Sequence, residues 1–410
     1  MTQASTAAAP GPLVAWTVEV DDPGELLTWL PAGESFAFLR GGDGIVGWGE
    51  AARLATDSAA DVQELLGSIT TRDDVGVAGC GAVALVSLGF APGVDASVVV
   101  VPKVVLGRRE GRSWLTLVTP PGAVEVPALR RRPVAAASNP PTAVSAELPS
   151  EAEWHEVIAT AVTALRTGRL EKVVLARAIE VTAQSDLDGR AVAARLARRF
   201  PSCFTFLCDG LVGASPELLI RRLGRHAESL VLAGTVRRGA TPEEDAELER
   251  EFLASTKDAE EHRFAAESVR DLLAEVAIDV VTDERPQLLR LANLSHLATH
   301  VDAWLPVPAP SALALAALLH PTAAVGGTPR PAALELIREL EAAPRERYAA
   351  PIGWVDANGD GEFAIALRCA QISGPRARLW AGGGIIGDSD PAAEVAETTV
   401  KFDAVLSALG

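Results

Sequence analysis

Short runs in which apolar and polar residues alternate dominate the first third of the chain, a pattern typical of strands with one buried face. Turn-forming residues separate these runs, as in the Gly-Gly-Asp-Gly segment at residues 41–44. The pattern predicts one short helix, at residues 60–69, and otherwise strands. The predicted strands cover residues 14–20, 36–40, 45–49, 98–106 and 114–118.

Helical spacing of apolar residues becomes prominent after residue 150. Ser150 and Glu153 form a capping-box pattern, and apolar residues then recur at helical spacing up to Gly168. Lys172 opens an apolar run that predicts a strand, and Pro391 opens the last predicted helix. Further helices are predicted at residues 190–199, 242–253, 257–274, 312–319 and 332–341, and further strands at 204–208, 218–222, 230–232, 278–282, 293–304, 351–355 and 363–372.

These helices and strands alternate irregularly, which argues against a regular βαβ winding. The predicted fold class is mixed α/β (α+β), with extended antiparallel sheets flanked by helices. Residues 120–147 are rich in Pro and Ala and are predicted to be a connector that crosses the surface. We therefore expect a disordered tail (1–12), a strand-rich portion (13–147) and a larger C-terminal portion (148–410) of the same fold.

Glycines and other small residues mark two predicted turns. The glycines at 382–384 and 387 are expected to form a turn before the last helix, and Ala233, Gly234 and Thr235 a small turn after a strand. The first of these also satisfies the GxGxxG pattern of dinucleotide-binding proteins. Only 23 residues follow Gly387, which leaves no room for the second strand of that unit. A nicotinamide-dependent oxidoreductase is therefore kept only as an alternative of a different class.

The composition is that of a globular protein with a large core. The chain has 410 residues, 48% of them hydrophobic, and a formal net charge of −17. Binding to nucleic acid is disfavoured, because the only run of basic residues is at 130–132 in the Pro/Ala-rich segment. The most apolar window, 75–94, is interrupted by Gly, Pro and Ser, which favours a buried strand and turn over a membrane span.

The cysteines and the N-terminal residues indicate a cytoplasmic protein. Cys80, Cys203, Cys208 and Cys369 show no CxxC spacing, which argues against a zinc site and against a disulfide scaffold. The first residues lack the basic start and apolar core of a secretory signal. A second metal pattern, Asp356, Asn358 and Asp360, resembles the start of an EF-hand loop. Its twelfth position is Leu367 where a bidentate Glu is required, so a hairpin turn is the better interpretation.

The last predicted helix carries the first candidate chemistry. Glu394, Glu397 and Lys401 are spaced i, i+3 and i+7, so two carboxylates and an ammonium share one helical face that could hold a hard cation and an anion. Such a face is more often simply solvated. Likewise, a Lys that opens a strand, a Ser-Pro-Glu turn and a lone His in a strand are each more often structural than functional.

Taken together, the motifs match the order found in one family. The series resembles the chorismate-utilising enzymes, which include isochorismate synthases, salicylate synthases and the large component of anthranilate synthase. The resemblance is strong from about residue 150 to the C-terminus and is limited to residues 47–51 before that. The motifs are Glu171-Lys172, Ser215-Pro216-Glu217, Ala233-Gly234-Thr235, Lys257-Asp258 to Glu261-His262, His296 to Thr299, His320-Pro321-Thr322, Ala381-Gly382 and Glu394 to Lys401.

The resemblance implies a magnesium-dependent site for chorismate. It assigns the Mg²⁺ that holds the ring carboxylate to Glu261 and Glu397, with Asp258 and Glu394 acting through water, a ligand set that magnesium tolerates. Residues 148–410 would then be the catalytic portion. The substrate-binding residues that it implies are Gly234, Thr235, His296, Ala324, Tyr348, Arg368, Gly382, Gly384 and Lys401, of which Arg368 and Tyr348 would bind the enolpyruvyl carboxylate.

Within this family, Lys at position 172 marks the enzymes that use water, whereas the ammonia-using enzymes carry Gln there. Lys172 would deprotonate a water that attacks C2, and Glu217 would protonate the C4 hydroxyl that leaves, which gives isochorismate. These roles require a neutral Lys172 and a protonated Glu217. The resemblance thus implies an isomerase that needs Mg²⁺ and chorismate and no amidotransferase subunit, and we expect a monomer.

Two alternatives inside the class remain. Salicylate synthases go on to eliminate pyruvate, but the lyase members carry Thr where this chain has Ala324, so isochorismate is favoured as the released product. A catalytically inactive relative is the other alternative. Two departures from the family pattern, Ala259 where Arg is usual and Val236-Arg237-Arg238 where Arg-Pro-Arg is usual, affect no proposed ligand. The sequence leaves open whether isochorismate feeds menaquinone or a siderophore.

Overall fold

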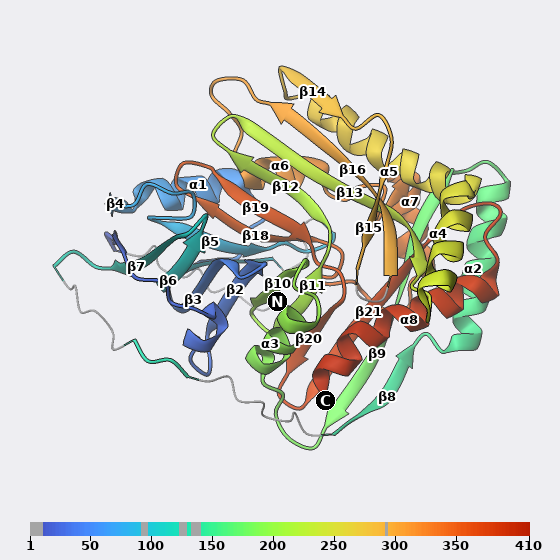
Figure 1. Cartoon of the computed structure of the whole chain (residues 1–410), viewed down its shortest axis with the longest axis horizontal. Helices are drawn as coiled ribbons and strands as arrows, with labels where there is room; N and C mark the ends of the chain where they lie inside the picture. Colours follow the sequence, from blue (N-terminus) through green and yellow to red (C-terminus); the bar gives the residue numbers. More distant parts are fainter. Residues whose placement is uncertain (1–10, 92–96, 123–128, 133–140, 292–293) are drawn as a thin grey trace, which may run out of the picture.

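The computed structural model describes residues 11–91, 97–122, 129–132, 141–291 and 294–410 (Figure 1). Most of the predicted tail, residues 1–10, lies outside the described residues, as do 123–128 and 133–140 of the predicted connector and Asn293 of a predicted strand. No helix in the described part of the chain is both long and apolar enough to cross a membrane.

The first third of the chain is rich in strands, as predicted. One α-helix, α1 (Ala59–Ser68), and a short 3₁₀ helix, Leu26–Trp29, interrupt them. The strands are β1 (Val14–Glu19), β2 (Ser35–Arg40), β3 (Asp43–Leu54), β4 (Thr70–Asp73), β5 (Val83–Ser87), β6 (Val98–Arg109) and β7 (Arg112–Thr119).

The rest of the chain mixes helices and strands, which confirms the predicted fold class. Its helices are α2 (Glu151–Arg166), α3 (Gly189–Arg199), α4 (Pro242–Ala254), α5 (Thr256–Ala274), α6 (Ala312–Leu319), α7 (Arg330–Leu340) and α8 (Pro391–Leu409). Its strands are β8 (Thr142–Leu148), β9 (Lys172–Ala183), β10 (Phe204–Cys208), β11 (Leu211–Ser215), β12 (Leu218–Leu223), β13 (His226–Arg237), β14 (Asp279–Thr282), β15 (Gln287–Arg290), β16 (Leu294–Trp304), β17 (Gly327–Thr328), β18 (Pro351–Asp356), β19 (Gly361–Ile365), β20 (Cys369–Ser373) and β21 (Arg376–Ile385).

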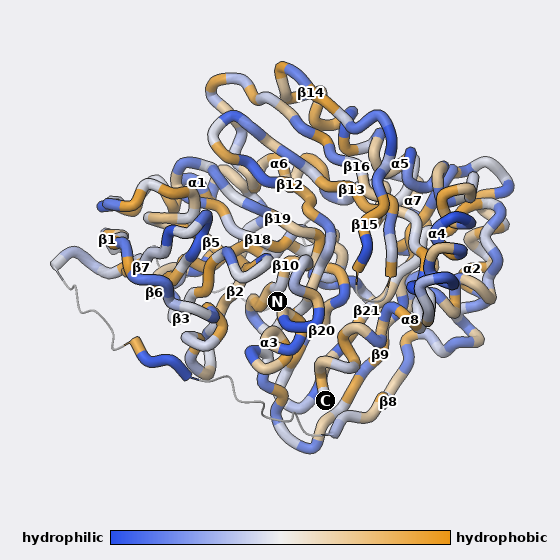
Figure 2. The backbone as a smooth tube through the Cα atoms, viewed as in Figure 1, coloured by the Kyte–Doolittle hydropathy of each residue, from blue (hydrophilic) through white to orange (hydrophobic). Residues whose placement is uncertain are grey.

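The strands form one continuous sheet that branches at β6. One arm runs β6-β3-β2-β10-β11-β20-β21-β9-β8, and the other runs β6-β5-β18-β19-β12-β13-β16, with β14 and β15 paired along β16 (Figure 1). Among the described strands, β1 and β4 pair in parallel and the other pairings are antiparallel. Hydrophobic residues (orange) occur throughout the strands and helices, as Figure 2 shows. Strands of both arms, such as β10 and β11 in one and β5, β18 and β19 in the other, are buried along their whole length.

Helix caps follow the sequence patterns closely. The Ser150 hydroxyl accepts from the backbone N–H of Glu153, and the Glu153 carboxylate accepts from the backbone N–H of Ser150, which completes the predicted capping box of α2. At the start of α8, the Asp390 carboxylate accepts from the backbone N–H of Ala393, and Pro391 occupies the first turn. Helix α8 packs on β21 and α2, and α5 packs on β13 and β16.

Several local predictions were wrong. The glycine-rich segment 382–384 is part of strand β21 and is not a turn, and residues 233–235 lie inside β13, where the pairing with β16 is irregular at Gly234. The predicted strand 363–372 is broken into β19 and β20, with Arg368 between them. Strand β8 lies within the predicted connector and pairs with β9. In each case a partner that is distant in sequence decides the local structure, which single-segment patterns do not reveal.

Candidate active site

A single cavity lies where the two arms of the sheet meet helices α5 and α8. Most of the site residues implied by the sequence line it together, although they come from both arms and from separate helices. Three others, Lys172, Asp258 and Glu394, lie outside its lining. The predicted site residues that line the cavity are Glu217, Gly234, Thr235, Glu261, His296, Ala324, Tyr348, Arg368, Gly382, Gly384, Glu397 and Lys401.

The glycines of β21 make room for side chains that come from other elements. A β-carbon on Gly384 would lie 2.3 Å from Oε1 of Glu261, and one on Gly382 would lie 3.1 Å from the Tyr348 hydroxyl. Side chains alternate across a strand, and a β-carbon on Gly383, on the opposite face, would lie 3.1 Å from Oε2 of Glu394. The glycines are therefore explained by close packing in a strand. A dinucleotide-binding loop, which requires a turn into a helix, is not present at this segment.

Glu217 is a buried acid at the cavity wall. It lies between β11 and β12, and it is only 4% exposed. Burial raises its pKa to about 8, although the backbone N–H of Leu232 and the nearby charges of Lys172 and Arg368 act in the opposite direction. The carboxyl group therefore carries a proton at neutral pH, which is the state that a general acid needs.

Lys172 lies directly behind Glu261. Its ammonium is fully buried, and Nζ lies 3.2 Å from Oε1 of Glu261, whose side chain is 15% exposed. A β-carbon on Gly384 would also lie 3.1 Å from Cε of Lys172, so the glycine admits the lysine side chain as well. A buried ammonium needs a compensating charge, and Glu261 supplies it here. Lys172 does not line the cavity itself. Its Nζ lies next to the carboxylate of Glu261, which does line it.

Arg368 has an unusual backbone conformation, and its side chain contacts a buried histidine. Its φ angle is +48°, a left-handed value that is uncommon for a residue other than glycine. Its Nη2 donates to Nε2 of His296 over 2.7 Å, and Nδ1 of His296 donates to the carbonyl of Gly234 over 3.0 Å. Because a carbonyl only accepts, the imidazole is the neutral Nδ1–H tautomer. Burial and the charge of Arg368 lower the pKa of His296 to about 3, in agreement with a neutral ring.

The guanidinium of Arg368 is available to an anion. The residue is 8% exposed, and its buried Nη1 finds no hydrogen-bond partner among the described residues. A buried donor without a partner is costly, so the arrangement is stabilised when a ligand accepts the hydrogen bond. A carboxylate is the natural acceptor for a guanidinium.

The acidic side chains implied as metal ligands divide into two groups. Glu261 of α5 and Glu397 of α8 both line the cavity, and Lys401 pairs with Glu397 over 2.5 Å while it donates to the Gly382 carbonyl over 2.8 Å. The Glu394 carboxylate is instead buried against Gly383 and accepts from the Ser389 hydroxyl over 2.8 Å. Asp258 lies close to Gly234, on the first turn of α5.

Two carboxylates that face one cavity from different helices provide the oxygen donors that Mg²⁺ prefers. No softer sulfur donor lines this cavity, and the absence of a side chain at Gly384 leaves the space that the Glu261 carboxylate occupies. The residues present therefore fit a hard divalent cation at Glu261 and Glu397.

The sequence did not single out two further residues of the cavity wall, Arg345 and Trp380. Arg345 donates to the carbonyl oxygens of Val325 and Val174 over 2.7 and 2.6 Å and thereby ties the loop after α6 to β9. Trp380 stacks on Tyr348 with the ring centroids 6.0 Å apart. Neither belongs to a motif, and the i, i+4 spacing of Glu341 and Arg345, which form an ion pair, is the only sequence signal for either.

Residues 32–410 match the family model described as "Chorismate binding enzyme". The chain belongs to this family. The match covers both arms of the sheet. It therefore includes most of the strand-rich N-terminal third, in which few motifs of the family are found.

Named relatives and solved structures agree with this family assignment. The chorismate-binding enzyme is 37% identical to the isochorismate synthase EntC of Escherichia coli (strain K12) over 268 residues, which are 64% of this chain and 68% of EntC. It superposes with a TM-score of 0.82 on MenF, the menaquinone-specific isochorismate synthase from Escherichia coli, at 26% identity over 98% of this chain and 96% of that one. Anthranilate synthase component I from Streptococcus pneumoniae shares the fold, with a TM-score of 0.70 at 18% identity over 98% and 94% of the two chains.

Proposed function

We propose that this chorismate-binding enzyme is an isochorismate synthase, which converts chorismate to isochorismate with Lys172 as the base and Glu217 as the acid. The observation that carries the proposal is the buried carboxyl group of Glu217 at the cavity wall, together with the buried amine of Lys172 beside Glu261 of the same wall. The similarity to EntC and MenF supports the same reaction.

The reaction requires one proton to be removed and one to be supplied. Lys172 takes a proton from a water molecule as the water oxygen forms a bond to C2 of the ring. The ring double bonds shift, the bond between C4 and its hydroxyl oxygen breaks, and Glu217 gives its proton to that oxygen so that it leaves as water. One water is consumed and one is released, so the product is an isomer of the substrate.

Arg368 would fix the enolpyruvyl carboxylate of the substrate. Its Nη1 supplies the missing hydrogen bond, and His296 holds the other end of the guanidinium, so the fork is oriented before the substrate arrives. The hydroxyl oxygen of Thr235 lies 3.2 Å from Nδ1 of His296. The histidine that supports the guanidinium is thus itself in contact with β13, at the point where the pairing of β13 is irregular. The backbone at Gly382 and Gly384 and the hydroxyl of Tyr348 would line the ring.

Glu261 and Glu397 would hold a Mg²⁺ ion, with Asp258 and Glu394 acting through water. When bound, the ion would neutralise and orient the ring carboxylate of chorismate. Lys401, paired with Glu397, would add a second cation on that side. Glu394 would act less directly than Glu261 and Glu397, because its carboxylate packs against Gly383 on the opposite face of β21 from Gly384.

The cavity also supports the release of isochorismate without further cleavage. Ala324 lines the cavity at the position where the lyase members of the family carry Thr, and a methyl group offers no hydroxyl to assist the loss of pyruvate. We further propose a cytoplasmic enzyme that works as a single subunit in menaquinone or siderophore biosynthesis. Free, buried thiols at all four cysteines support a reducing compartment. Residues 148–410 would form the catalytic portion, with 13–147 completing the same fold.

Product analysis tests this function. Purified protein with chorismate and Mg²⁺ is expected to give isochorismate, which releases pyruvate only after an isochorismate-cleaving enzyme is added. Salicylate and pyruvate from the purified protein alone would assign it as a salicylate synthase. A protein that binds chorismate without turnover would be an inactive relative, and the assignment of Lys172 and Glu217 would then be wrong.

A further inference from the structure

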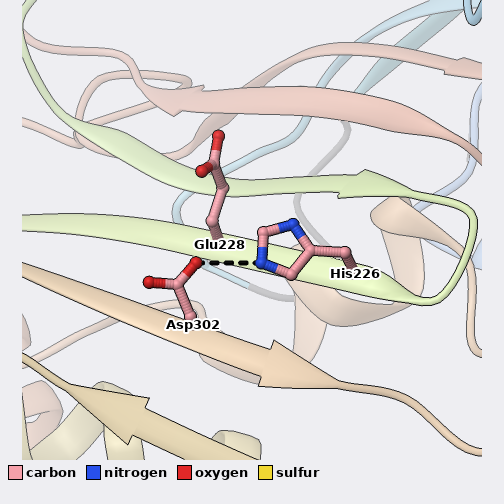
Figure 3. Close-up of side chains that lie close together, drawn as sticks. All are labelled: His226, Glu228 and Asp302. Carbon is pink, nitrogen blue, oxygen red and sulfur yellow. Dashed lines mark hydrogen bonds and ion pairs between the residues drawn. The ribbon is translucent and has the colours of Figure 1, made fainter.

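A second cluster of side chains that can bind a metal lies near the start of β13, whereas the cavity lies near the end of this strand. His226 and Glu228 are two residues apart on β13, and Asp302 lies on β16 directly opposite Glu228 in the antiparallel ladder. Figure 3 shows His226 and Asp302 facing each other, while the carboxylate of Glu228 points away from that pair and forms an ion pair with Arg221 of β12. One ligand atom from each of them lies within 4.8 Å of the other two. No other such group of three occurs among the described residues.

We infer that His226, Glu228 and Asp302 form a binding site for a divalent transition-metal ion such as Zn²⁺ or Co²⁺. The site is separate from the cavity, because Glu228 and Gly234 are six residues apart on one strand, or about 20 Å. The inference does not depend on the proposed function, which uses none of these three residues.

The ladder already places the ligands near coordination geometry. Nε2 of His226 lies 2.9 Å from Oδ1 of Asp302, where a hydrogen bond joins them. Ligand atoms about 2.0 to 2.1 Å from a tetrahedral ion lie about 3.3 Å from each other, so an ion can replace the proton shared by His226 and Asp302. Glu228 has to turn from Arg221 toward this pair to complete the site. The imidazole nitrogen favours zinc, cobalt or nickel over magnesium or calcium, which prefer oxygen alone.

The local charges are compatible with a bound cation. Glu228 and Asp302 are like charges directly opposite each other in an antiparallel pair, an arrangement that destabilises a sheet unless a cation offsets it. Arg221 of β12 does pair with Glu228, but it also donates through Nε to Glu362 over 2.6 Å. Arg221 therefore keeps an anionic partner when Glu228 turns to a metal, and a carboxylate can in any case accept from Arg221 with one oxygen and bind metal with the other.

Solvent access and a neighbouring tryptophan make the site measurable. The side chains of His226 and Asp302 are 39% and 43% exposed, so an ion can enter and keep water in its remaining positions. Trp304 lies opposite His226 in the ladder, with the ring centroids 5.6 Å apart. Its indole is close enough for bound Co²⁺ to quench its fluorescence, whereas Zn²⁺ has no such effect.

The test uses the full chain in saturating Mg²⁺, which occupies carboxylate sites of the cavity. Equilibrium dialysis with Zn²⁺ is expected to retain a single ion per chain in the wild type and in the control His155→Gln, whose histidine is exposed beside Glu156 on α2. His226→Gln and Asp302→Asn should each lose this ion. Far-UV circular dichroism spectra and melting temperatures unchanged from the wild type would show that both variants fold.

Fluorescence gives an independent result. Co²⁺ should quench the wild type and not His226→Gln, and Trp304→Phe should abolish the quenching while it keeps the retained zinc. Zinc retention in His226→Gln equal to that in the wild type, or no retained zinc in the wild type, would overturn the inference.

Discussion

Two lysine–glutamate pairs lie at the cavity and differ chiefly in their access to water. Lys172 and Glu261 have side chains that are 0% and 15% exposed, whereas Lys401 and Glu397 are 21% and 34% exposed. Lys401 also donates to the Gly382 carbonyl, so its charge is shared between two acceptors. Lys172 is therefore enclosed in this structure, whereas Lys401 lies partly in solvent.

This difference separates a chemical role from a binding role. A general base has to be held at one position beside the reacting atoms, which an enclosed side chain with a fixed neighbour provides. A lysine that only attracts an anion works as well when it is partly solvated. Lys172 therefore fits the base and Lys401 the binding residue, and mutations can break or sharpen that distinction.

The largest expected effect is that of Lys172→Ala. Removing a general base should lower kcat by about 10³-fold, because such groups contribute about 10²- to 10⁴-fold. Binding of chorismate in the presence of Mg²⁺ should remain, since Arg368 and the acidic residues are intact. Steady-state kinetics together with calorimetric binding measure the two quantities, and unchanged turnover would contradict the role of Lys172.

Glu217→Gln should have the next largest effect, about 10²-fold in kcat, with a change in the pH profile. Burial raises the pKa of Glu217 to about 8, so the acid is protonated below that pH and its proton is lost above it. Wild-type kcat should consequently fall as the pH rises through about 8. The amide cannot titrate, so the variant should lack this decline. A wild-type profile that stays flat up to pH 10 would argue against Glu217 as the acid.

Arg368→Lys should weaken the substrate complex more than the chemical step. An ammonium cannot keep both the contact to His296 and a forked contact to a carboxylate, and the lost charged hydrogen bond is worth about 2 kcal/mol, or about 30-fold in KM. Arg378→Lys is a matched control, because Arg378 pairs with Glu180 and Glu346 at the surface. If the two substitutions changed KM equally, Arg368 would not be the carboxylate ligand.

Lys401→Ala should have the smallest effect of the four, about fivefold in KM with kcat less affected, because a partly exposed ion pair contributes only about 1 kcal/mol. The same kinetic assay compares it with Lys172→Ala. A loss of kcat as large as that of the Lys172 variant would remove the distinction between the two pairs.

Much of the fold was predictable where one segment determines its own structure. The bounds of α6 and β10 agree with the prediction, and the capping box of α2 is formed as the sequence indicated. The errors occur where distant elements decide. Gly382 and Gly384 suggest a turn when considered alone, yet Tyr348 and Glu261 fill the space that side chains would take in the strand.

The motifs predicted much of the candidate site, but they did not reveal all of its residues or contacts. The resemblance supplied the residue types, and the fold brings most of those residues to one cavity. The sequence could not indicate that Arg368 interrupts a strand with a left-handed backbone or that its guanidinium contacts His296 of another strand. Nor could it reveal that Arg345 ties the cavity wall together through backbone carbonyls.

The central claim is that Lys172 and Glu217 add water at C2 of chorismate and expel the C4 hydroxyl. The most direct measurement is mass spectrometry of isochorismate formed in ¹⁸O-labelled water. The account predicts one ¹⁸O atom per product molecule, located in the C2 hydroxyl, with no labelled product from the Lys172→Ala variant. Isochorismate that carries only the unlabelled oxygen of the substrate would show that the hydroxyl migrates within the molecule, and it would contradict the account.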